Sequence, residues 1–349
     1  MKILHAADWH LDTAFTGHTE ADVQYLKKAL LTIPDTVAEL CRQHHCDLLL
    51  LSGDLFDGPA TRESVDAVKM ALAQLTIPVF ISPGNHDFCV PGSPYLTEVW
   101  PENVHIFTTP TMQSITIASL DCKVYGAGYT SMDCDPLLEH FRAEGNQRYH
   151  IGILHGDPLQ RSAPYCPITQ AQVADSALDY LALGHIHKAG SFRCGETLCA
   201  WPGCPMGRGN DETGEKGVYL VTLEDTASIQ FIPLDTPRFY DWEVEVQTTA
   251  EQALRSVLPP VGNGHFYRIT LTGEKEPGDI CSLPEFPRLQ IRDKTIPPTP
   301  LWDALGQDSL EGIYFQLLHD ALATTDEETV LLAAKISRNI LDGREVNLP

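Results

Sequence analysis

The chain has 349 residues, of which 43% are hydrophobic, and it carries a formal net charge of −23 at pH 7. That length exceeds one average domain, so we expect one large domain with a smaller appendage. No apolar run approaches the ~20 residues that span a bilayer, and the N-terminus lacks the apolar stretch of a signal peptide. We therefore expect a cytoplasmic protein that does not enter a membrane.

The acidic charge bears on the class of substrate. A protein that binds nucleic acid through its own surface usually carries a basic patch. With a net charge of −23, either the substrate is not a polynucleotide or a partner supplies most of the phosphate contacts. Bound divalent cations would also offset the negative charge locally.

The first part of the chain alternates apolar runs with helical patterns. Runs typical of buried strands lie at residues 2–7, 47–51, 77–81, 149–154, 180–183, 217–223 and 229–233. Helical spacing predicts a long helical stretch over residues 22–45 and a helix over 63–75. This alternation predicts a mainly parallel sheet with covering helices, in which ligands bind beyond the carboxyl ends of the strands.

The composition changes near residues 233–237, and we place the end of a first domain, 1–235, at this point. A β/α unit over residues 236–295 follows, with predicted strands at 242–246 and 267–271 and a helix at 250–258. Residues 296–349 begin with the stiff Pro-rich linker 296–300 and contain two helices.

The first of these helices carries an apolar stripe made of Leu310, Ile313, Tyr314, Leu317, Leu318, Ala321 and Leu322. Thr325 and Glu328 predict a capping box for the second helix, and Gly343 is a plausible stop. The second helix carries Leu331, Leu332, Ile336 and Ile340. These apolar faces either pack onto their own domain or bind a partner in a helix-in-groove contact.

Polar side chains gather where the predicted strands end. They are Asp8, His10, Asp54, Asn85, His86, His155, His185 and His187. Oxygen donors mixed with imidazoles suit Mn²⁺, Fe²⁺ or Zn²⁺ better than Ca²⁺. Seven of these eight residues, arranged around one shared carboxylate, fit a two-metal site with ions ~3.5–4 Å apart. The spacing of two within Asp8–His10 and His185–His187 would project each pair to one side of an extended chain.

Each motif is weak when taken singly. A lone Asp-x-His is more often a solvated surface pair, and a lone Gly-Asp carries almost no information. Gly-Asn-His-Asp after an apolar strand is stronger, because glycine permits a tight turn that aims the next side chains. The ordered set of five clusters, each at a predicted strand end, is what indicates a metal site.

Five segments carry a resemblance to a known family: ADWHLD at residues 7–12, SGDLFD at 52–57, PGNHD at 83–87, LHG at 154–156 and YLALGHIHK at 180–188. With them the sequence resembles the calcineurin-like metallophosphoesterase superfamily, and within it the DNA-repair exonuclease subunits of the SbcD/YhaO type. The resemblance implies a four-layer α/β/β/α sandwich with a small β/α capping domain and C-terminal helices.

The resemblance also implies two divalent metal ions, Mn²⁺ foremost, with Fe²⁺ or Zn²⁺ as alternatives. It assigns Asp8, His10, Asp54 and His187 to one ion, and Asp54, Asn85, His155 and His185 to the other. His86 would face the substrate and stabilise developing charge or protonate the leaving oxygen. Asp57 stands where some relatives carry a second active-site histidine, and it could instead orient a ligand.

The implied function is a two-metal phosphodiesterase that acts as a DNA exonuclease or endonuclease subunit. Its expected partners are DNA, an SMC-like coiled-coil ATPase docked on the C-terminal helices, and a second copy of the chain. A small-molecule phosphodiesterase or phosphatase is the main alternative, and the acidic charge favours it. The phosphoprotein phosphatase pattern Gly-Asp-x-Val-Asp-Arg-Gly is absent. A non-catalytic interaction subunit is a third hypothesis. Residues 236–349 favour the nuclease, since a small-molecule hydrolase does not need them.

Overall fold

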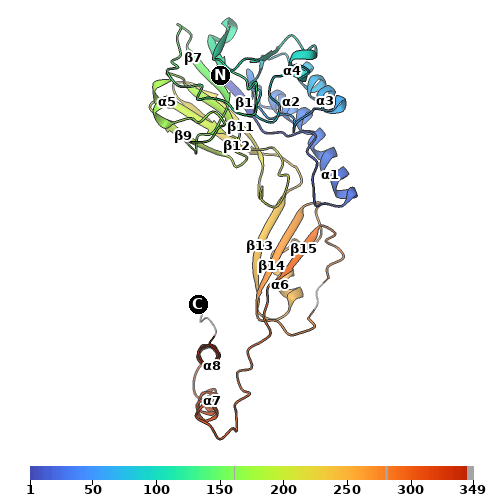
Figure 1. The fold of residues 1–349 in the computed structure, drawn as a ribbon, viewed down its shortest axis with the longest axis vertical. Helices are drawn as coiled ribbons and strands as arrows, with labels where there is room; N and C mark the ends of the chain where they lie inside the picture. The colour runs from blue at the N-terminus through green and yellow to red at the C-terminus, as the bar shows by residue number, and fades with distance from the viewer. Residues whose placement is uncertain (161, 280–281, 344–349) are drawn as a thin grey trace. The chain divides into compact units, whose positions relative to one another are not determined.

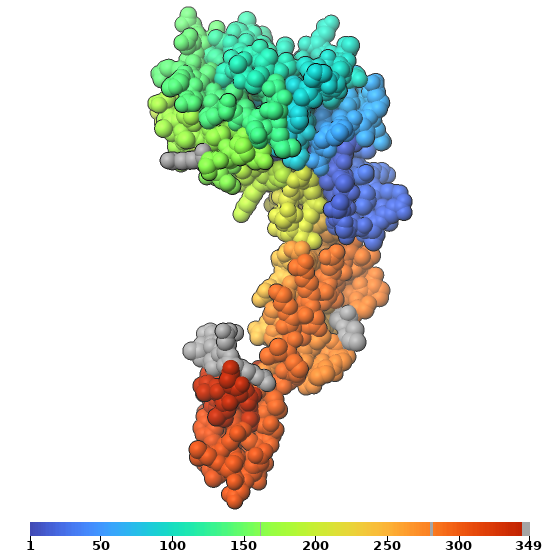
Figure 2. All heavy atoms as spheres, viewed as in Figure 1, coloured from blue at the N-terminus to red at the C-terminus, as the bar shows by residue number. Residues whose placement is uncertain are grey.

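The computed structural model describes residues 1–160, 162–279 and 282–343 (Figure 1). The chain forms two compact units, one made of residues 1–240 and 264–266 and the other of 241–263 and 267–349. The space-filling view shows the first unit as one close-packed body, coloured from blue to yellow (Figure 2). The division into three domains at residues 235 and 295 stays a prediction.

The first sheet has the strand order β12-β11-β1-β2-β3-β4. Its strands are β1 (Lys2–Ala6), β2 (Leu48–Leu51), β3 (Val79–Ile81), β4 (Val104–Ile106), β11 (Gly217–Leu223) and β12 (Ala227–Pro233). Strands β1 to β4 run parallel, and β11 and β12 are antiparallel to their neighbours. The carboxyl ends of β1, β2 and β3 therefore meet at one edge.

The second sheet has the order β5-β6-β7-β8-β10-β9. It contains β5 (Gln113–Ile117), β6 (Cys122–Gly126), β7 (Tyr149–His155), β8 (Tyr180–Gly184), β9 (Gly190–Cys194) and β10 (Thr197–Trp201). The four central strands are parallel, and the edge strands β5 and β9 are antiparallel. Both sheets are thus mixed, and the predicted parallel arrangement holds for β1 to β4 in the first sheet and for the four central strands of the second.

The helices of the first unit are α1 (Glu20–Leu31), α2 (Ile33–Gln43), α3 (Arg62–Ala73), α4 (Pro94–Thr97) and α5 (Gln170–Asp175). The predicted helical stretch over residues 22–45 is divided into two helices, α1 and α2. Pro34 lies in the first turn of α2. Proline has no backbone N–H and its ring clashes with the preceding turn, so it begins a new helix rather than continuing the old one.

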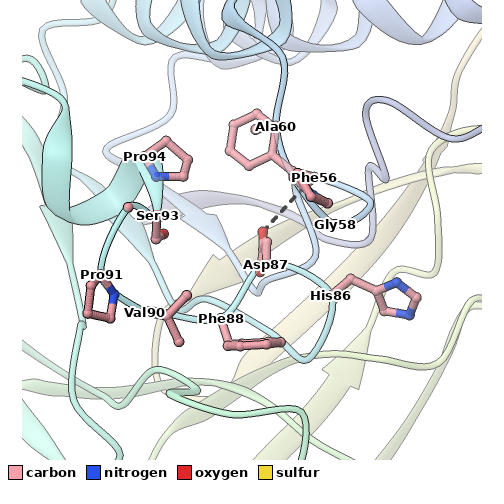
Figure 3. Close-up of a pocket in the computed structure, with 12 residues that line it drawn as sticks. Phe56, Gly58, Ala60, His86, Asp87, Phe88, Val90, Pro91, Ser93 and Pro94 are labelled. Carbon is pink, nitrogen blue, oxygen red and sulfur yellow. Dashed lines mark hydrogen bonds between the residues drawn. The ribbon is translucent and has the colours of Figure 1, made fainter.

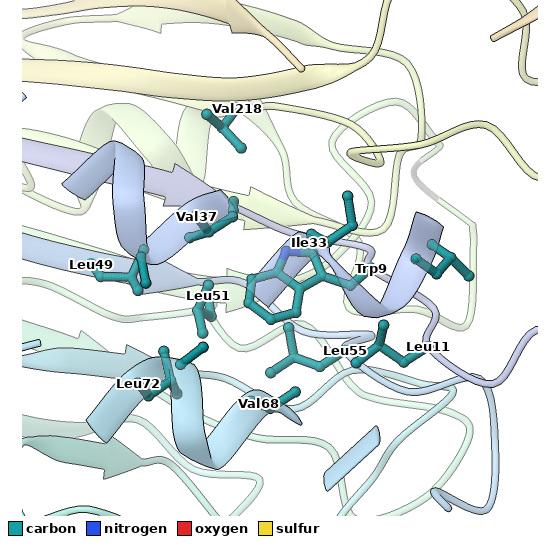
Figure 4. Packing of buried hydrophobic residues seen from close by; sticks show 14 of the residues in the cluster. Trp9, Leu11, Ile33, Val37, Leu49, Leu51, Leu55, Val68, Leu72 and Val218 are labelled. Atoms are coloured by element: carbon teal, nitrogen blue, oxygen red, sulfur yellow. The ribbon is translucent and has the colours of Figure 1, made fainter. Parts of the chain in front are cut away.

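The strand β2 shows how the layers are held together. Leu49 and Leu51 pack with the side chains of α2 and α3, as Figure 4 shows, while Leu48 and Leu50 face the second sheet. A parallel strand buried on both faces reads as a continuous apolar run. A third cluster, which includes Leu154, covers the outer face of the second sheet. The fold is therefore the predicted layered α/β sandwich, with helices outside two stacked sheets.

The second unit contains most of a three-stranded sheet ordered β13-β14-β15. Its elements are β13 (Phe239–Val246), α6 (Ala250–Val257), β14 (Phe266–Gly273), β15 (Leu289–Asp293), α7 (Leu310–Ala321) and α8 (Glu327–Leu341). The predicted capping box at Thr325 is wrong, since the carboxylate of Asp326 accepts the capping hydrogen bond from the backbone N–H of Thr329. None of the helices that the structure describes is long and apolar enough to cross a membrane.

Candidate metal centre

Loops that follow parallel strands of the two sheets bring the predicted site residues together. The loops after β1 and β2 lie side by side, because the N–H groups of Asp8 and His10 donate to the carbonyls of Gly53 and Asp54 at 3.0 and 2.9 Å. The N–H of His185, beyond β8, donates to Asp8 Oδ1 at 2.9 Å. This last bond joins the second sheet to the first at the site.

The backbone at the site differs from the predicted extended form. Asp8, His10, Asp54 and His185 have φ angles of 53°, 47°, 51° and 90°. Residues other than glycine seldom adopt this left-handed region, and such residues concentrate at functional sites. The side chains do converge as expected, but tight left-handed turns aim them and not the alternation of a strand.

Glycine makes room for the central carboxylate. A Cβ atom at Gly84 would lie 2.2 Å from Asp54 Oδ1. The N–H of Gly84 donates to Asp87, whose carboxylate also accepts from the N–H of Leu55 and the hydroxyl of Tyr95. Asp87 thereby ties together the loops that carry Asp54 and His86, a role that the sequence motif alone did not reveal.

Two groups of candidate ligands meet at Asp54. On one side, Nε2 of His10 lies 3.1 Å from Nε2 of His187 and 3.7 Å from Asp54 Oδ2. Three donor atoms of Asp8, His10 and His187 lie within 4.8 Å of one another. This is the group that the resemblance assigns to one ion.

On the other side, Nε2 of His155 lies 2.9 Å from Asn85 Oδ1 and 3.2 Å from Asp54 Oδ2. Nδ1 of His185 lies 3.2 Å from the same Asn85 oxygen. All seven predicted ligands therefore come together, and Asp54 contacts members of both groups.

Hydrogen bonds fix which imidazole nitrogen faces the site. Nδ1 of His155 lies 2.9 Å from the carbonyl of Ser52, which can only accept, so Nδ1 carries a proton and Nε2 is the nitrogen that faces the site. Nδ1 of His187 lies 2.6 Å from Glu212 Oε1. A carboxylate at this distance requires the proton on Nδ1, which leaves Nε2 of His187 as the free nitrogen.

These donors fit a bound cation. Asp8, His10, Asp54 and His155 are at most 1% exposed. Asp8 Oδ2 is buried without a hydrogen-bond partner among the described residues. Buried carboxylates and facing imidazole lone pairs are costly unless positive charge lies between them. Carboxylate, amide and imidazole donors suit a transition metal such as Mn²⁺, Fe²⁺ or Zn²⁺.

The charges at the centre depend on their neighbours. Burial works against the charged form of His155, yet Asp54 raises the pKa of His155 to about 9. Burial also opposes ionisation of Asp54, but the charge of His155 keeps the pKa of Asp54 below its ordinary value. Burial lowers the pKa of His185 to about 4, which favours the neutral ring that a metal ion needs.

His86 and Asp57 form a pair at the rim. Nδ1 of His86 lies 2.8 Å from Asp57 Oδ1, and the side chain of His86 is 41% exposed. Asp57 Oδ1 also lies 3.6 Å from Nδ1 of His10, and its other oxygen accepts from Thr13. Hydrogen bonding to Asp57 raises the pKa of His86. The imidazoles of His10 and His86 hold the pKa of Asp57 well below its ordinary value.

Sequence reasoning missed Glu212 and Arg208. Arg208 donates to Glu212 through Nε and Nη2 and from its backbone N–H, and Nη2 lies 2.9 Å from Nδ1 of His187. Burial opposes ionisation of Glu212, but His187 and Arg208 hold the pKa of Glu212 well below its ordinary value. The signal in the sequence is an Arg-x-x-x-Glu pair at residues 208–212, beyond the last of the five segments that carry the resemblance.

Over residues 1–189 the chain matches the family described as calcineurin-like phosphoesterase. It is 32% identical over 238 residues to the uncharacterized metallophosphoesterase YhaO of Bacillus subtilis, across 63% of this chain and 57% of YhaO. It is 24% identical over 340 residues to the SbcD subunit of the nuclease SbcCD from the same organism, across 83% of each chain. The solved structure of TT1561 from Thermus thermophilus is similar with a TM-score of 0.41 and 13% identity, across 66% of this chain and 98% of TT1561.

Proposed function

Because the chain belongs to the calcineurin-like phosphoesterase family, we propose that it hydrolyses phosphodiester bonds with two Mn²⁺ ions. The observation that carries the proposal is the meeting of two donor groups at Asp54. Asp8, His10, Asp54 and His187 would hold one ion, and Asp54, Asn85, His155 and His185 the other. When bound, such a pair of ions neutralises phosphoryl oxygens and lowers the pKa of water.

The protein side chains supply positioning and proton transfer. Ser52 and Glu212 hold His155 and His187 with their free nitrogens toward the site. His86 is exposed at the rim, and Asp57 keeps it charged over a wider pH range. His86 is therefore suited to donate a proton to the leaving oxygen or to stabilise charge that develops on the phosphoryl group.

We propose DNA as the substrate. The similarity to the SbcD subunit of the nuclease SbcCD extends over 83% of this chain, beyond the family match that ends at residue 189. The net charge of −23 argues against unaided binding to a polynucleotide. Either bound cations and a partner supply the phosphate contacts, or the substrate is a small phosphodiester, which is the second candidate.

The C-terminal helices are the proposed docking surface for a coiled-coil ATPase. Phe315 of α7 and Ala334 of α8 are fully buried. They pack in one cluster with apolar residues of the segment that precedes α7. In contrast, Leu310, Ile313 and Leu317 are 86%, 56% and 65% exposed. An apolar face of this kind favours helix-to-helix contact with a partner. The predicted homodimer and cytoplasmic location stay predictions.

The test is metal-dependent hydrolysis by the full chain. Protein loaded with Mn²⁺ is expected to cleave bis-p-nitrophenyl phosphate and single-stranded DNA, and EDTA is expected to abolish both activities. Cleavage of the small ester without DNA cleavage, even with a coiled-coil ATPase present, would exclude the nuclease and favour the small-molecule enzyme. Absence of both activities in metal-loaded protein would contradict a catalytic role and favour an interaction subunit.

A further inference from the structure

A pocket of about 380 Å³ opens beside His86. Two loops line it, residues 56–60 after β2 and residues 86–94 after β3. Its volume lies within the range of about 300–1,000 Å³ that small-molecule sites occupy. Neither the proposed metal ligands nor the pair of His86 and Asp57 requires such a pocket for its proposed role.

The walls are apolar and stiff. Figure 3 shows Phe88 and Val90 on one side of the space and Phe56 and Pro94 on the other. Three prolines are among the lining residues, namely Pro59, Pro91 and Pro94. Proline fixes its own φ angle, so the loops lose little freedom when a ligand enters. A flat ring placed here would contact an aromatic face.

The ring of His86 points away from the other lining side chains, and the rest of the pocket offers no free charge to a ligand. Apart from His86, Asp87 is the one ionisable side chain among the described residues that line it. The Asp87 carboxylate already accepts from the N–H groups of Leu55 and Gly84 and from the hydroxyl of Tyr95. A charged ligand group would therefore lose its hydration without gaining a partner. An uncharged ring that needs few hydrogen bonds is the chemistry that fits.

His86 connects the pocket to the proposed phosphate position. Its backbone N–H donates to Asp54 Oδ1 at 2.9 Å, and its ring lies against Asp57. In Figure 3 the ring of His86 points away from the other side chains that line the pocket. Because His86 lines the pocket and its backbone contacts Asp54, an ester group of a phosphodiester at the metal centre can extend past His86 toward the pocket.

We propose that this pocket receives the unpaired nucleobase next to the scissile phosphate, so that the enzyme prefers nucleotidyl esters to alkyl phosphodiesters. The proposal rests on the proposed function and adds a substrate class to it. A base stacked on Phe88 must leave its own helix, which restricts the substrate to single-stranded or frayed ends. Base pairing would keep the ring out of the pocket.

The test compares short single-stranded oligonucleotides that carry an abasic tetrahydrofuran unit at the 5′ end, at the 3′ end or at neither. With Mn²⁺-loaded wild type, removing the base at one of the two ends should raise KM about tenfold, as expected for one base–aromatic stack. Val90→Asp places a carboxylate in the wall at a position that is 38% exposed. The ratio of KM values for abasic and natural substrates should fall to about one in this variant.

Val99→Asp is the matched control, since Val99 is 85% exposed and does not line the pocket. It adds the same charge and should retain the tenfold ratio. General repulsion between the new carboxylate and the phosphates raises KM for both substrates alike, so it cancels in the ratio of the two KM values. If base removal at neither end changes KM in wild type, or if Val90→Asp keeps the ratio, the proposal is wrong.

A second measurement separates this proposal from the proposed function. Saturation-transfer NMR on the wild type with thymidine monophosphate should show transfer to the thymine ring that Val90→Asp abolishes and Val99→Asp retains. If no oligonucleotide is cleaved but this transfer occurs, the proposed nuclease function is wrong and the proposed binding of a base in the pocket is supported. Absence of transfer to the thymine ring in wild type would overturn the pocket even in an active enzyme.

Discussion

The carboxylate of Glu212 accepts a 2.6 Å hydrogen bond from Nδ1 of His187 and leaves Nε2 of that ring free to face His10. Nη2 of Arg208 donates to the same carboxylate oxygen, Oε1, at 2.7 Å. Carboxylates that orient a metal-bound histidine in this way typically contribute about 10–100-fold to metal affinity. Glu212 thus acts on the centre through His187 without belonging to the proposed ligand set.

Glu212→Gln is expected to weaken binding of the ion at His187 about tenfold or more. The amide keeps the shape of the side chain and an oxygen acceptor, but it lacks the negative charge that favours a proton on Nδ1. Calorimetric titration of the metal-free protein with Mn²⁺ measures the effect. Glu215→Gln is the control, because Glu215 is exposed and pairs with Arg238. Equal Mn²⁺ affinity in both variants and wild type would remove the role assigned to Glu212.

His86→Ala should reduce the rate of hydrolysis without loss of metal, whereas Asp54→Ala should reduce metal binding itself. His86 is exposed at the rim, whereas Asp54 is 1% exposed and lies between the two donor groups. His86→Ala is expected to keep both ions and to lose about 10²–10⁴-fold in rate, the usual contribution of a general acid or charge stabiliser. Asp54→Ala is expected to lose metal.

Elemental analysis after gel filtration, together with hydrolysis of bis-p-nitrophenyl phosphate, distinguishes the two variants. His140→Ala provides a control for removal of an exposed histidine, since its side chain is 93% exposed. Similar metal loss in His86→Ala and Asp54→Ala would show that His86 is a ligand, and the proposed division of roles would then be wrong.

The candidate ligands follow from the sequence because parallel strands place their carboxyl ends along one edge. Asp8, Asp54 and Asn85 follow β1, β2 and β3, and His155 and His185 mark the ends of β7 and β8. Each of these strands is a short apolar run that the sequence displays directly. The assignment of each residue to an ion came from the family resemblance and stays a proposal.

Other features depend on contacts that no local pattern encodes. The left-handed backbone at Asp8 and Asp54 is held by hydrogen bonds between loops that are far apart in the sequence. Glu212 and Arg208 lie outside any strand end, so the rule that found the ligands passes over them. The break between α1 and α2 is a different case, because Pro34 is a local signal that helical spacing alone ignores.

His5 makes stability depend on pH. It is buried between the hydroxyls of Tyr180 and Ser52, each 2.8 Å from a ring nitrogen. Burial lowers the pKa of His5 from 6.5 to about 3. Below pH 6.5 His5 is protonated in the unfolded chain, but in the folded chain it stays neutral down to about pH 3. Acid therefore stabilises the unfolded state, and the free energy of unfolding falls as the pH falls from 6.5 to about 3. At pH 5 the loss from this one group amounts to about 2 kcal/mol.

His5→Gln should therefore be less stable than wild type at pH 7.5 but lose less on acidification. The difference in unfolding free energy between the two proteins is expected to shrink by about 2 kcal/mol at pH 5. Urea unfolding in EDTA, followed by tryptophan fluorescence, measures it without metal linkage. His140→Gln, at an exposed site, controls for loss of one histidine. A constant difference at the two pH values would show that His5 titrates normally in the folded protein.

The exposed face of α7 allows the partner proposal to be tested in the full chain. Ile313 and Leu317 are exposed, whereas Phe315 of the same helix is fully buried against Trp302 and Ala334. Ile313→Glu combined with Leu317→Glu changes only the exposed face and leaves the internal contacts of the helix pair in place. This double variant should no longer capture a coiled-coil ATPase in a pull-down, because burying two carboxylates in an apolar contact is strongly unfavourable.

Gln316→Glu is the control, since it adds charge at an exposed position of the same helix. The metal ligands all lie in the first unit, so the double variant should keep its Mn²⁺ content and its hydrolysis of bis-p-nitrophenyl phosphate. If the double variant still captures the ATPase, the docking surface lies elsewhere. If it unfolds or loses its metal, the apolar face serves the fold of the chain itself, and the proposed docking on α7 and α8 is wrong.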